Sequence, residues 1–364
     1  MNLKREEQRL VLEGKIYSSE TIDQLSELKD STPSPFLKEL YLFLKDWFAP
    51  SPYITVQTSG STGVPKQLTV LKEQMMQSAR LTCEFLQLEA GDTALLCMPL
   101  QYIAGKMVVV RALVAGLNLI LRTPSGHPLA NINFPLKFAA MVPLQVYNSL
   151  QIPEEKECLS QIKNLIIGGG AIDATLEKEI SQLPNMIYST YGMTETLSHI
   201  ALRRLNGAKP SAHYHPFSSV DLSLSPDNTL IINAPLVCCT KLITNDVAEI
   251  FEDGTFIILG RKDNIINSGG IKIQIEKVEQ LLQPIIPVNF AITSRVDERL
   301  GEAITLLIEQ TFILETIKEK IKKILPKYQQ PKEIVIVKEI PFTGSGKIDR
   351  AACRLLANKS KTKI

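Results

Sequence analysis

The sequence predicts an α/β protein: a large N-terminal domain of mixed sheets with flanking helices and a small β subdomain, then a C-terminal α+β domain. Short apolar runs alternate with helical periods as far as Ser189, which is typical of a sheet with helices on its faces. Short β runs broken by turn residues fill residues 220–259 and indicate an antiparallel subdomain. Helices and strands alternate again after Asp263, over about a hundred residues, enough for a separate core. We therefore expect two domains, at residues 1–262 and 263–364.

The expected elements of the first domain follow from periodicity. Apolar residues recur at helical spacing over 36–48 and 72–88, and Gly91-Asp92 ends the second helix. A helix over 108–114 lies between two apolar runs, which makes a βαβ unit. The expected strands are 53–56, 94–98, 119–121, 138–142, 165–167 and 186–189.

The second half has shorter β runs and denser turn signals. The expected strands of the small subdomain are 220–224, 230–233, 242–243, 248–251 and 256–259. After Asp263 we expect helices over 275–282 and 314–324, strands over 304–308 and 334–337, and a frayed polar tail over 357–363.

Composition bounds the class of protein. The formal net charge of the 364-residue chain is +2, so no charge bias favours nucleic acid or an anionic membrane. The six cysteines have no CxxC pair and no zinc spacing, which indicates reduced thiols in the core. The N-terminus is too charged for a signal peptide, and no run approaches the ~20 apolar residues of a membrane span. We expect a cytoplasmic protein with small-molecule partners, and the sequence leaves a homodimer open.

The most distinctive stretch is TSGSTGVPK, which follows a strand-like run. Its glycines allow positive φ and inward-turned N–H groups, and its hydroxyls and lysine add donors and a positive charge. Such a loop suits a polyphosphate, although its spacing is not that of a Walker A loop and a flexible linker has a similar composition. The residues expected to contact phosphate are Thr58, Ser59, Gly60, Ser61, Thr62, Gly63 and Lys66.

A second stretch is YGMTET. Tyr191 on the turn at Gly192 can lie flat against a purine, while Thr194 offers a hydroxyl and Glu195 an oxygen ligand suited to Mg²⁺. A strand-to-helix turn with a capping threonine explains the same residues. Like the run 168–170, this stretch follows an expected strand, so both can share one cleft at the carboxyl ends of the strands.

Two further stretches carry charged residues. Asp246 precedes Arg261 and Asp263, and a carboxylate can accept both hydroxyls of a ribose; an ordinary hairpin aspartate is the alternative. Lys347 lies on the glycine-rich run PFTGSGKIDR, where a solvated basic tail is the alternative.

The order and spacing of the four stretches resemble the adenylate-forming superfamily, which includes acyl-CoA synthetases, firefly luciferase and peptide-synthetase adenylation domains. The resemblance extends from about Tyr53 to Arg350. TSGSTGVPK is similar to the superfamily's phosphate loop and YGMTE to its adenine and magnesium motif. GRKDNIINSGGIKI resembles its hinge and crossover motif, and PFTGSGKIDR the motif of its catalytic lysine.

The resemblance implies that the chain binds ATP, Mg²⁺ and coenzyme A, and that a mobile C-terminal domain rotates about Asp263 between two half-reactions. It also implies a role for each matched residue. Gly168, Gly169 and Gly170 would line the nucleotide and acyl pocket, Tyr191 and Gly192 would hold adenine, Thr194 the α-phosphate, Glu195 the Mg²⁺, Asp246 and Arg261 the ribose, Gly269 and Gly270 the pantetheine arm, and Lys347 would bridge the carboxylate and the α-phosphate.

The short region before the phosphate loop, with YGMTET and with ITND in place of the usual TGD, resembles the o-succinylbenzoate–CoA ligases of menaquinone synthesis. A dicarboxylate needs a cation for the carboxylate that does not react, because burying an unpaired charge is costly. The acyl pocket is expected to include residues 98–106, among them Gly105. We expect Arg111, just after this stretch, to supply the cation, and Lys106 is the second candidate. The alternative is that both cations face solvent on a helix.

Other functions remain open at this stage. Another aryl- or fatty-acid–CoA ligase would use the same chemistry, and a catalytically silent acyl-adenylate-binding protein would keep the fold. A peptide-synthetase adenylation domain is less favoured, because no carrier domain follows Ile364.

Overall fold

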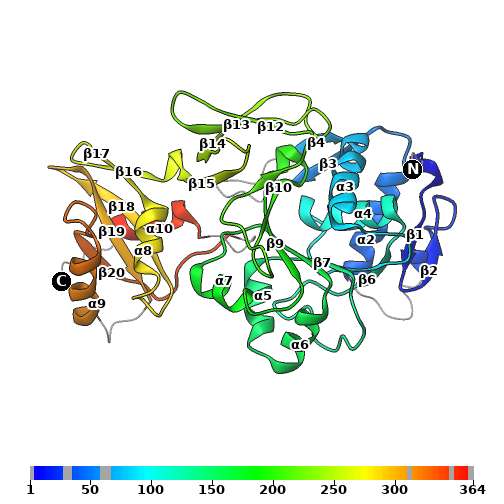
Figure 1. Cartoon of the computed structure of the whole chain (residues 1–364), viewed down its shortest axis with the longest axis horizontal. Coiled ribbons are helices and arrows are strands. Elements are labelled where there is room, and N and C mark those ends of the chain that lie inside the picture. Colours follow the sequence, from blue (N-terminus) through cyan, green and yellow to red (C-terminus); the bar gives the residue numbers. More distant parts are fainter. Residues whose placement is uncertain (1–3, 28–34, 58–66, 310–313, 344–347, 360–364) are drawn as a thin grey trace.

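The computed structural model describes residues 4–27, 35–57, 67–309, 314–343 and 348–359. A nine-stranded sheet forms its centre (Figure 1). The α/β fold class is thereby confirmed. In spatial order the strands are β11 (His215–Pro216), β10 (His199–Arg204), β9 (Met186–Gly192), β8 (Asn164–Ile167), β7 (Phe138–Met141), β5 (Thr93–Leu96), β6 (Asn118–Leu121), β1 (Leu10–Leu12) and β2 (Lys15–Tyr17).

The order of the strands in the sheet reverses beside β5. Its six central strands run parallel, and antiparallel strands close both edges. After β5 the chain crosses to β6 on one side, and later β7 pairs with β5 on the other side. In open α/β sheets, ligands commonly bind at the carboxyl ends of the strands near such a reversal. Strands β5 and β7 are almost wholly buried apolar runs, as central parallel strands require.

Helices flank this sheet in two groups, with α2, α3 and α4 in one and α5, α6 and α7 in the other (Figure 1). The expected helices over 36–48, 72–88 and 108–114 are confirmed, although the third begins at Ile103. The apolar face of the first buries Phe36, Leu40 and Trp47. The bounds of the helices are α1 (Gln24–Glu27), α2 (Pro35–Phe48), α3 (Lys72–Leu86), α4 (Ile103–Ala115), α5 (Pro143–Leu150), α6 (Pro153–Gln161) and α7 (Ala174–Ile180), with a 3₁₀ turn η1 (Arg5–Glu7).

Two small antiparallel sheets accompany the large one. One is a pair, β3 (Tyr53–Gln57) with β4 (Gln67–Leu71). The other has four strands, β12 (Asp221–Leu224), β13 (Thr229–Asn233), β14 (Leu242–Ile250) and β15 (Phe256–Arg261). The two expected strands at 242–243 and 248–251 are a single strand, so that expectation was wrong. The pairing register of β14 with β15 shifts between Val247 and Ala248, and this bulge interrupted the pattern in the sequence.

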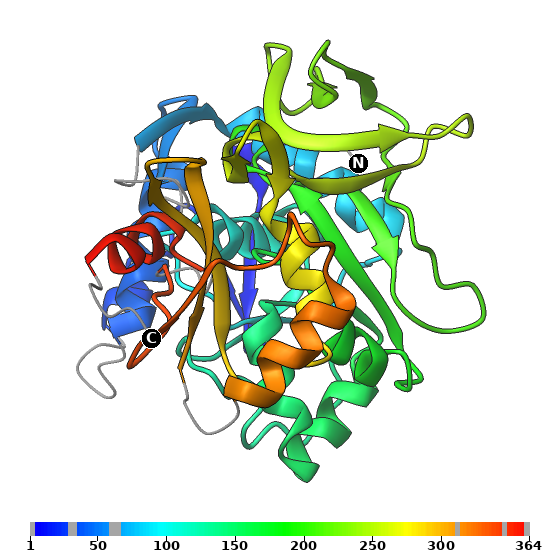
Figure 2. The same ribbon diagram turned by 90° about the vertical axis from the view of Figure 1, so that its left-hand side faces the viewer.

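The C-terminal part has its own sheet and its own buried clusters (Figure 2). Helices α8 and α9 and strands β19 and β20 match the expectations. Strand β18 and helix α10 were not predicted, and the expected polar tail begins within α10, where Ala357 is buried. The elements are η4 (Lys262–Asn264), β16 (Ile265–Ser268), β17 (Ile271–Gln274), α8 (Ile275–Leu282), β18 (Phe290–Asp297), β19 (Gly301–Ile308), α9 (Leu314–Ile324), β20 (Glu333–Ile336) and α10 (Arg350–Lys359).

In the described part of the chain, no helix combines the length and the apolar character needed to cross a membrane.

Candidate active site

The glycine run after β8 lies directly beside the end of β9. Ile167 pairs with Ser189 in the parallel ladder, so Gly168 comes level with Thr190. A Cβ on Gly168 would lie 2.3 Å from Thr190 Oγ1, so a side chain at this position would displace the Thr190 side chain. Gly169 has a φ of +82°, which favours glycine. The structure thus brings two of the predicted stretches together at one edge of the sheet.

Tyr191 spans the gap between the large sheet and the four-stranded sheet. It lies within β9, which continues three residues beyond the expected end. Its hydroxyl donates to Asp246 Oδ2 at 2.6 Å, and its ring packs edge-on against Phe256 with centroids 5.3 Å apart. Burial, together with the Asp246 charge, raises the pKa of Tyr191, so the phenol is a neutral donor at any physiological pH.

Asp246 and Arg261 form an ion pair on adjacent strands of the four-stranded sheet. Arg261 Nη1 donates to Asp246 Oδ1 at 3.0 Å, while its Nε and Nη2 donate to the two oxygens of Asp263 at 2.9 and 2.8 Å. Asn245 Nδ2 reaches Asp263 at 3.4 Å. One guanidinium therefore joins the carboxylate predicted to hold ribose to the residue predicted to be the hinge.

The chain turns sharply after β9 into the 3₁₀ turn η3 (Thr194–Thr196). A Cβ on Gly192 would lie 2.3 Å from the carbonyl oxygen of Ser198, so the turn requires glycine there. The Thr196 hydroxyl accepts from the N–H of Met193, which makes Thr196 the capping threonine. Glu195 is exposed and Thr194 half-buried at the same edge of the sheet as the glycine run. An exposed carboxylate of this kind can give Mg²⁺ one hard oxygen ligand.

Arg111 on α4 is buried, with 2% of its surface exposed, so the solvent-facing alternative is wrong for this residue. Its Nη2 donates to Ser198 Oγ at 2.6 Å, and its Nε has no hydrogen-bond partner among the described residues. Burial lowers the pKa of Arg111 to about 10, which leaves it charged near neutral pH. No ion pair links this charge to a described carboxylate.

Lys106 and Gly105 lie one to two turns earlier on the same helix. Lys106 Nζ donates to the carbonyl oxygen of Thr55 at 3.4 Å and lies 5.5 Å from the centroid of the Phe43 ring. Gly105 packs against the backbone at the end of β5, because a Cβ there would lie 2.5 Å from the Pro99 carbonyl oxygen. The structure therefore directs the two candidate cations to different neighbours.

The remaining predicted residues divide into two groups. Gly269 and Gly270 form the turn of the β16–β17 hairpin with φ of +58° and +83°, and Figure 1 places that hairpin away from β9. The phosphate-loop residues Thr58, Ser59, Gly60, Ser61, Thr62, Gly63 and Lys66, and the lysine Lys347, lie outside the described residues.

Sequence reasoning missed four residues of this region. Tyr214 and Phe256 complete an aromatic cluster with Tyr191, with centroids 5.3 to 5.9 Å apart, and Tyr214 also hydrogen-bonds Ser189 at 2.9 Å. Ser198 and His199 lie just past the YGMTET motif; Ser198 accepts from Arg111 and is hydrogen-bonded to His199. The closeness of Ser198 to the motif in the sequence could have marked it as a site residue. The aromatic contacts join segments that lie far apart in the sequence, so no local pattern indicates them.

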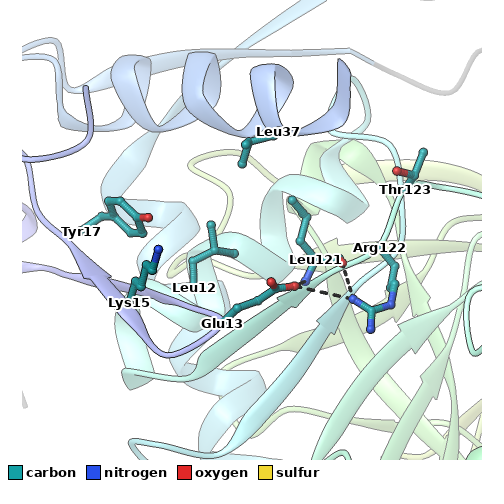
Figure 3. Close-up of a pocket in the computed structure, with 8 residues that line it drawn as sticks. All are labelled: Leu12, Glu13, Lys15, Tyr17, Leu37, Leu121, Arg122 and Thr123. Carbon is teal, nitrogen blue, oxygen red and sulfur yellow. Dashed lines mark hydrogen bonds and ion pairs between the residues drawn. The ribbon is translucent and has the colours of Figure 1, made fainter. Parts of the chain in front are cut away.

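A cavity of about 400 Å³ opens elsewhere, at the carboxyl ends of β1 and β6 beneath α2 (Figure 3). Glu13 and Arg122 line it and form an ion pair at 3.6 Å. It contains none of the predicted site residues.

The glycine turn and the Tyr191 ring lie at the carboxyl edge of the open sheet, and the Asp246–Arg261 pair of the four-stranded sheet is hydrogen-bonded to that ring's hydroxyl. Such an arrangement is typical of a nucleotide-binding α/β protein. The chain belongs to the AMP-binding enzyme family, whose sequence pattern matches residues 4–235. It is similar to an AMP-forming acyl-CoA synthetase and AMP-acid ligase II-like protein of Dyadobacter fermentans. That crystal structure shares 32% identity, covers 88% of this chain and 93% of its own, and has a TM-score of 0.61.

Two other relatives are more distant. A 2-succinylbenzoate–CoA ligase of Enterococcus faecalis is 25% identical over an alignment of 372 positions that covers 92% of this chain and 76% of the relative. The o-succinylbenzoate CoA synthetase of Bacillus subtilis, solved with its acyl-adenylate intermediate, has a TM-score of 0.70 at 22% identity and covers 85% and 69% of the two chains. The latter supports the fold alone.

Proposed function

We propose that this protein is an ATP-dependent acid–CoA ligase that works through an acyl-adenylate, and that its acid is o-succinylbenzoate. The products are o-succinylbenzoyl-CoA, AMP and diphosphate. The name of the Enterococcus faecalis relative supports this acid, and membership of the AMP-binding enzyme family supports the nucleotide.

The observation that carries the proposal is the buried charge of Arg111. An arginine with 2% exposure, one hydrogen bond and no ion pair to a described carboxylate is costly to bury. A second anion that arrives with the substrate would relieve this cost. A dicarboxylic acid supplies one, because it keeps a free carboxylate after the other has reacted. Arg111 is favoured over Lys106, which already contacts Thr55 and Phe43.

The nucleotide fits the residues around Tyr191. Asp246 uses one oxygen for the Tyr191 hydroxyl and the other for Arg261, and each oxygen keeps a lone pair for a ribose hydroxyl. Adenine would lie against the ring of Tyr191 and the run 168–170. Glu195 would hold Mg²⁺, which offsets negative charge on the phosphates, and Thr194 would donate to the α-phosphate.

The chemistry needs two steps because a carboxylate is a poor electrophile toward a thiol at neutral pH. In the first step a carboxylate oxygen attacks the α-phosphorus of ATP, diphosphate leaves, and a mixed anhydride with AMP forms. In the second step the thiolate of coenzyme A attacks the carbonyl carbon and AMP leaves. The first step mostly needs positioned cations and donors, which Lys66 and Lys347 would supply.

The expected domains, hinge, cellular location and oligomeric state are also proposals. We infer that residues 1–262 and 263–364 are domains that rotate about Asp263, and that Gly269 and Gly270 approach the pantetheine arm after rotation. We also propose that the protein acts in the cytoplasm and forms a homodimer. Sedimentation velocity at several concentrations tests the dimer.

One assay separates the proposed function from its competitors. Diphosphate release is measured with a panel of acids, with and without coenzyme A. Diphosphate release with o-succinylbenzoate, and with no other acid of the panel, supports the proposal. Faster diphosphate release with aryl or fatty acids points to another acid–CoA ligase. Binding of the adenylate without turnover of any acid would indicate a silent binding protein.

The role of Arg111 has its own test. Arg111→Ala should raise the KM for o-succinylbenzoate at least about tenfold, because a hydrogen bond between charged groups is lost, while the KM for ATP stays constant. Lys106→Ala serves as the comparison for the second candidate cation. An unchanged KM for o-succinylbenzoate in Arg111→Ala would remove the assignment.

A further inference from the structure

Arg111 is hydrogen-bonded to a chain of polar groups that begins at the half-buried Ser198 and continues through the buried His199 and Thr82. The Ser198 hydroxyl that accepts from Arg111 at 2.6 Å lies 3.3 Å from His199 Nδ1. His199 Nε2 lies 3.1 Å from Thr82 Oγ1 on α3, and the Thr82 hydroxyl reaches the carbonyl oxygen of Ser78 at 3.2 Å. Thr82 is fully buried and His199 is 6% exposed, so water does not offer these groups other partners.

The positions of the protons in these hydrogen bonds follow from the last acceptor, the carbonyl oxygen of Ser78. The carbonyl oxygen of Ser78 can only accept, so the Thr82 hydroxyl donates to it. Thr82 Oγ1 then accepts from His199, which fixes the imidazole proton on Nε2. His199 Nδ1 is left with a lone pair and accepts the proton of the Ser198 hydroxyl. Ser198 Oγ therefore presents its lone pairs to Arg111.

Electrostatics maintain the same arrangement. Burial, with the Arg111 charge as a second cause, holds the pKa of His199 well below its ordinary value. The neutral ring can accept at Nδ1, whereas a protonated ring would place a second N–H against Ser198 and a second positive charge near Arg111. Cys83 on α3 is a titratable neighbour of Arg111, and burial raises its pKa to about 12, so it stays neutral as well.

The backbone holds Ser198 in place from the other side. Leu197, buried and non-glycine, has a φ of +65°, a conformation that costs energy and persists only where its surroundings enforce it. The Leu197 N–H donates to the carbonyl oxygen of Thr194 at 2.9 Å, and Thr196 Oγ1 lies 2.8 Å from the Ser198 carbonyl oxygen. The strained turn thus ties Ser198 to the motif that would bind the α-phosphate.

We propose that Ser198, His199 and Thr82 are positioning residues that aim the Arg111 guanidinium at the second carboxylate of the substrate. The inference rests on the proposed function. With one nitrogen held by Ser198, the guanidinium loses rotational freedom before the substrate arrives, and its Nε–H, which has no partner among the described residues, can donate to the carboxylate. None of the three residues needs to touch the substrate.

The test compares two acids and a matched set of variants. o-Succinylbenzoate carries the ring carboxylate, and 4-oxo-4-phenylbutanoate lacks it. Thr82→Val removes the hydroxyl at nearly constant volume, Thr82→Ser keeps it, and Ser198→Ala removes the acceptor of Arg111. We expect Ser198→Ala to raise the KM for o-succinylbenzoate about tenfold, because it removes a hydrogen bond to a charged group. Thr82→Val acts on Arg111 only through His199 and Ser198, so we expect a rise of the KM in the same direction. Both variants should leave the KM for ATP constant.

The second acid separates positioning from general damage. The KM for 4-oxo-4-phenylbutanoate should not change in either variant, and Thr82→Ser should behave as the parent protein does. An equal rise for both acids, or equal damage from Thr82→Ser and Thr82→Val, would overturn the inference. Should Thr82→Val fail to fold, Ser198→Ala gives the same comparison from the other end of the chain of bonds. Failure of the parent protein to use o-succinylbenzoate would instead count against the proposed function.

Discussion

Asp246 is the residue on which the nucleotide region depends. It is 8% exposed, and its two oxygens each have a partner before any ligand binds: Tyr191 on one side and Arg261 on the other. Its N–H is bonded to the Thr244 hydroxyl at 3.1 Å, so the backbone is fixed as well. A carboxylate held in this way offers lone pairs in set directions, and a ribose would bind without reorganising it.

Asp246→Asn is therefore predicted to weaken ATP binding with little change in the fold. The amide keeps the shape but loses the charge, and a hydrogen bond to a charged group contributes roughly 1.5–3 kcal/mol, so the KM for ATP should rise about tenfold or more. Arg261 keeps Asp263, so thermal stability should fall only slightly. Asp227→Asn, in an exposed pair with Lys262, is the control. Equal KM values for ATP in both variants would contradict the role.

The cysteines give a second prediction at this scale. Cys239 is exposed and Cys238 half-buried, whereas the other four are buried. Burial raises the pKa of Cys97 to about 12 and that of Cys353 to about 11, so these thiols stay protonated and unreactive. A thiol reagent at pH 8 should modify two cysteines quickly in the native protein and all six in urea. Rapid native modification of a third would show that a buried cluster opens.

At the scale of elements, strand β18 shows how an exposed sheet edge is closed. It is the edge strand of the C-terminal sheet, and its free backbone groups would invite pairing with another chain. Glu279 on α8 accepts from the Ile292 N–H at 2.8 Å, and Arg350 on α10 donates to the Ile292 carbonyl oxygen at 3.3 Å. The two side chains also form a pair of hydrogen bonds, each 2.6 Å long. One ion pair thus occupies the edge and joins two helices.

Glu279→Ala is predicted to destabilise this part of the protein strongly. The change leaves Arg350 half-buried without its partner and the Ile292 N–H unpaired, at a cost of about 3 kcal/mol in the free energy of unfolding. Urea unfolding measures the loss, and light scattering should show earlier aggregation. Glu319→Ala, which breaks the exposed pair with Lys322, should change the free energy of unfolding far less. Similar losses in the two variants would contradict the edge-closing role.

The same elements explain what the sequence could and could not predict. Buried strands such as β5 and β8 are continuous apolar runs, and α2 has a clear apolar face, so local pattern sufficed. The sequence pattern predicts two strands where the structure has the single strand β14, because the bulge in β14 breaks the alternation of apolar and polar residues. Helix α10 has only two buried residues, Cys353 and Ala357, so its apolar face gives a weak signal. The contact of Ser198 with Arg111 joins residues 87 apart, and no local pattern encodes it.

At the scale of the whole molecule, Arg261 couples the two proposed domains. Its guanidinium bonds Asp246 in β14 and Asp263 in η4, where the C-terminal part begins. The bonds to Asp263, with the Asp246 charge as a further cause, raise the pKa of Arg261 and keep it charged. Occupation of Asp246 by ribose and movement about Asp263 therefore act on the same side chain. This is a physical route by which nucleotide binding can bias the orientation of the C-terminal part.

Lys347 provides the sharpest test of such a two-orientation enzyme. Lys347→Ala should slow formation of o-succinylbenzoyl-adenylate by roughly a hundredfold or more, because a cation aimed at the developing charge is lost. Conversion of the preformed adenylate to the CoA thioester should change little, since that step requires the lysine to have moved away. Lys338→Ala, at an exposed position of the same C-terminal part, is the matched control and should affect neither step. If the Lys347 variant slowed both half-reactions equally, a fixed arrangement of the two parts would explain the chemistry better than rotation about Asp263.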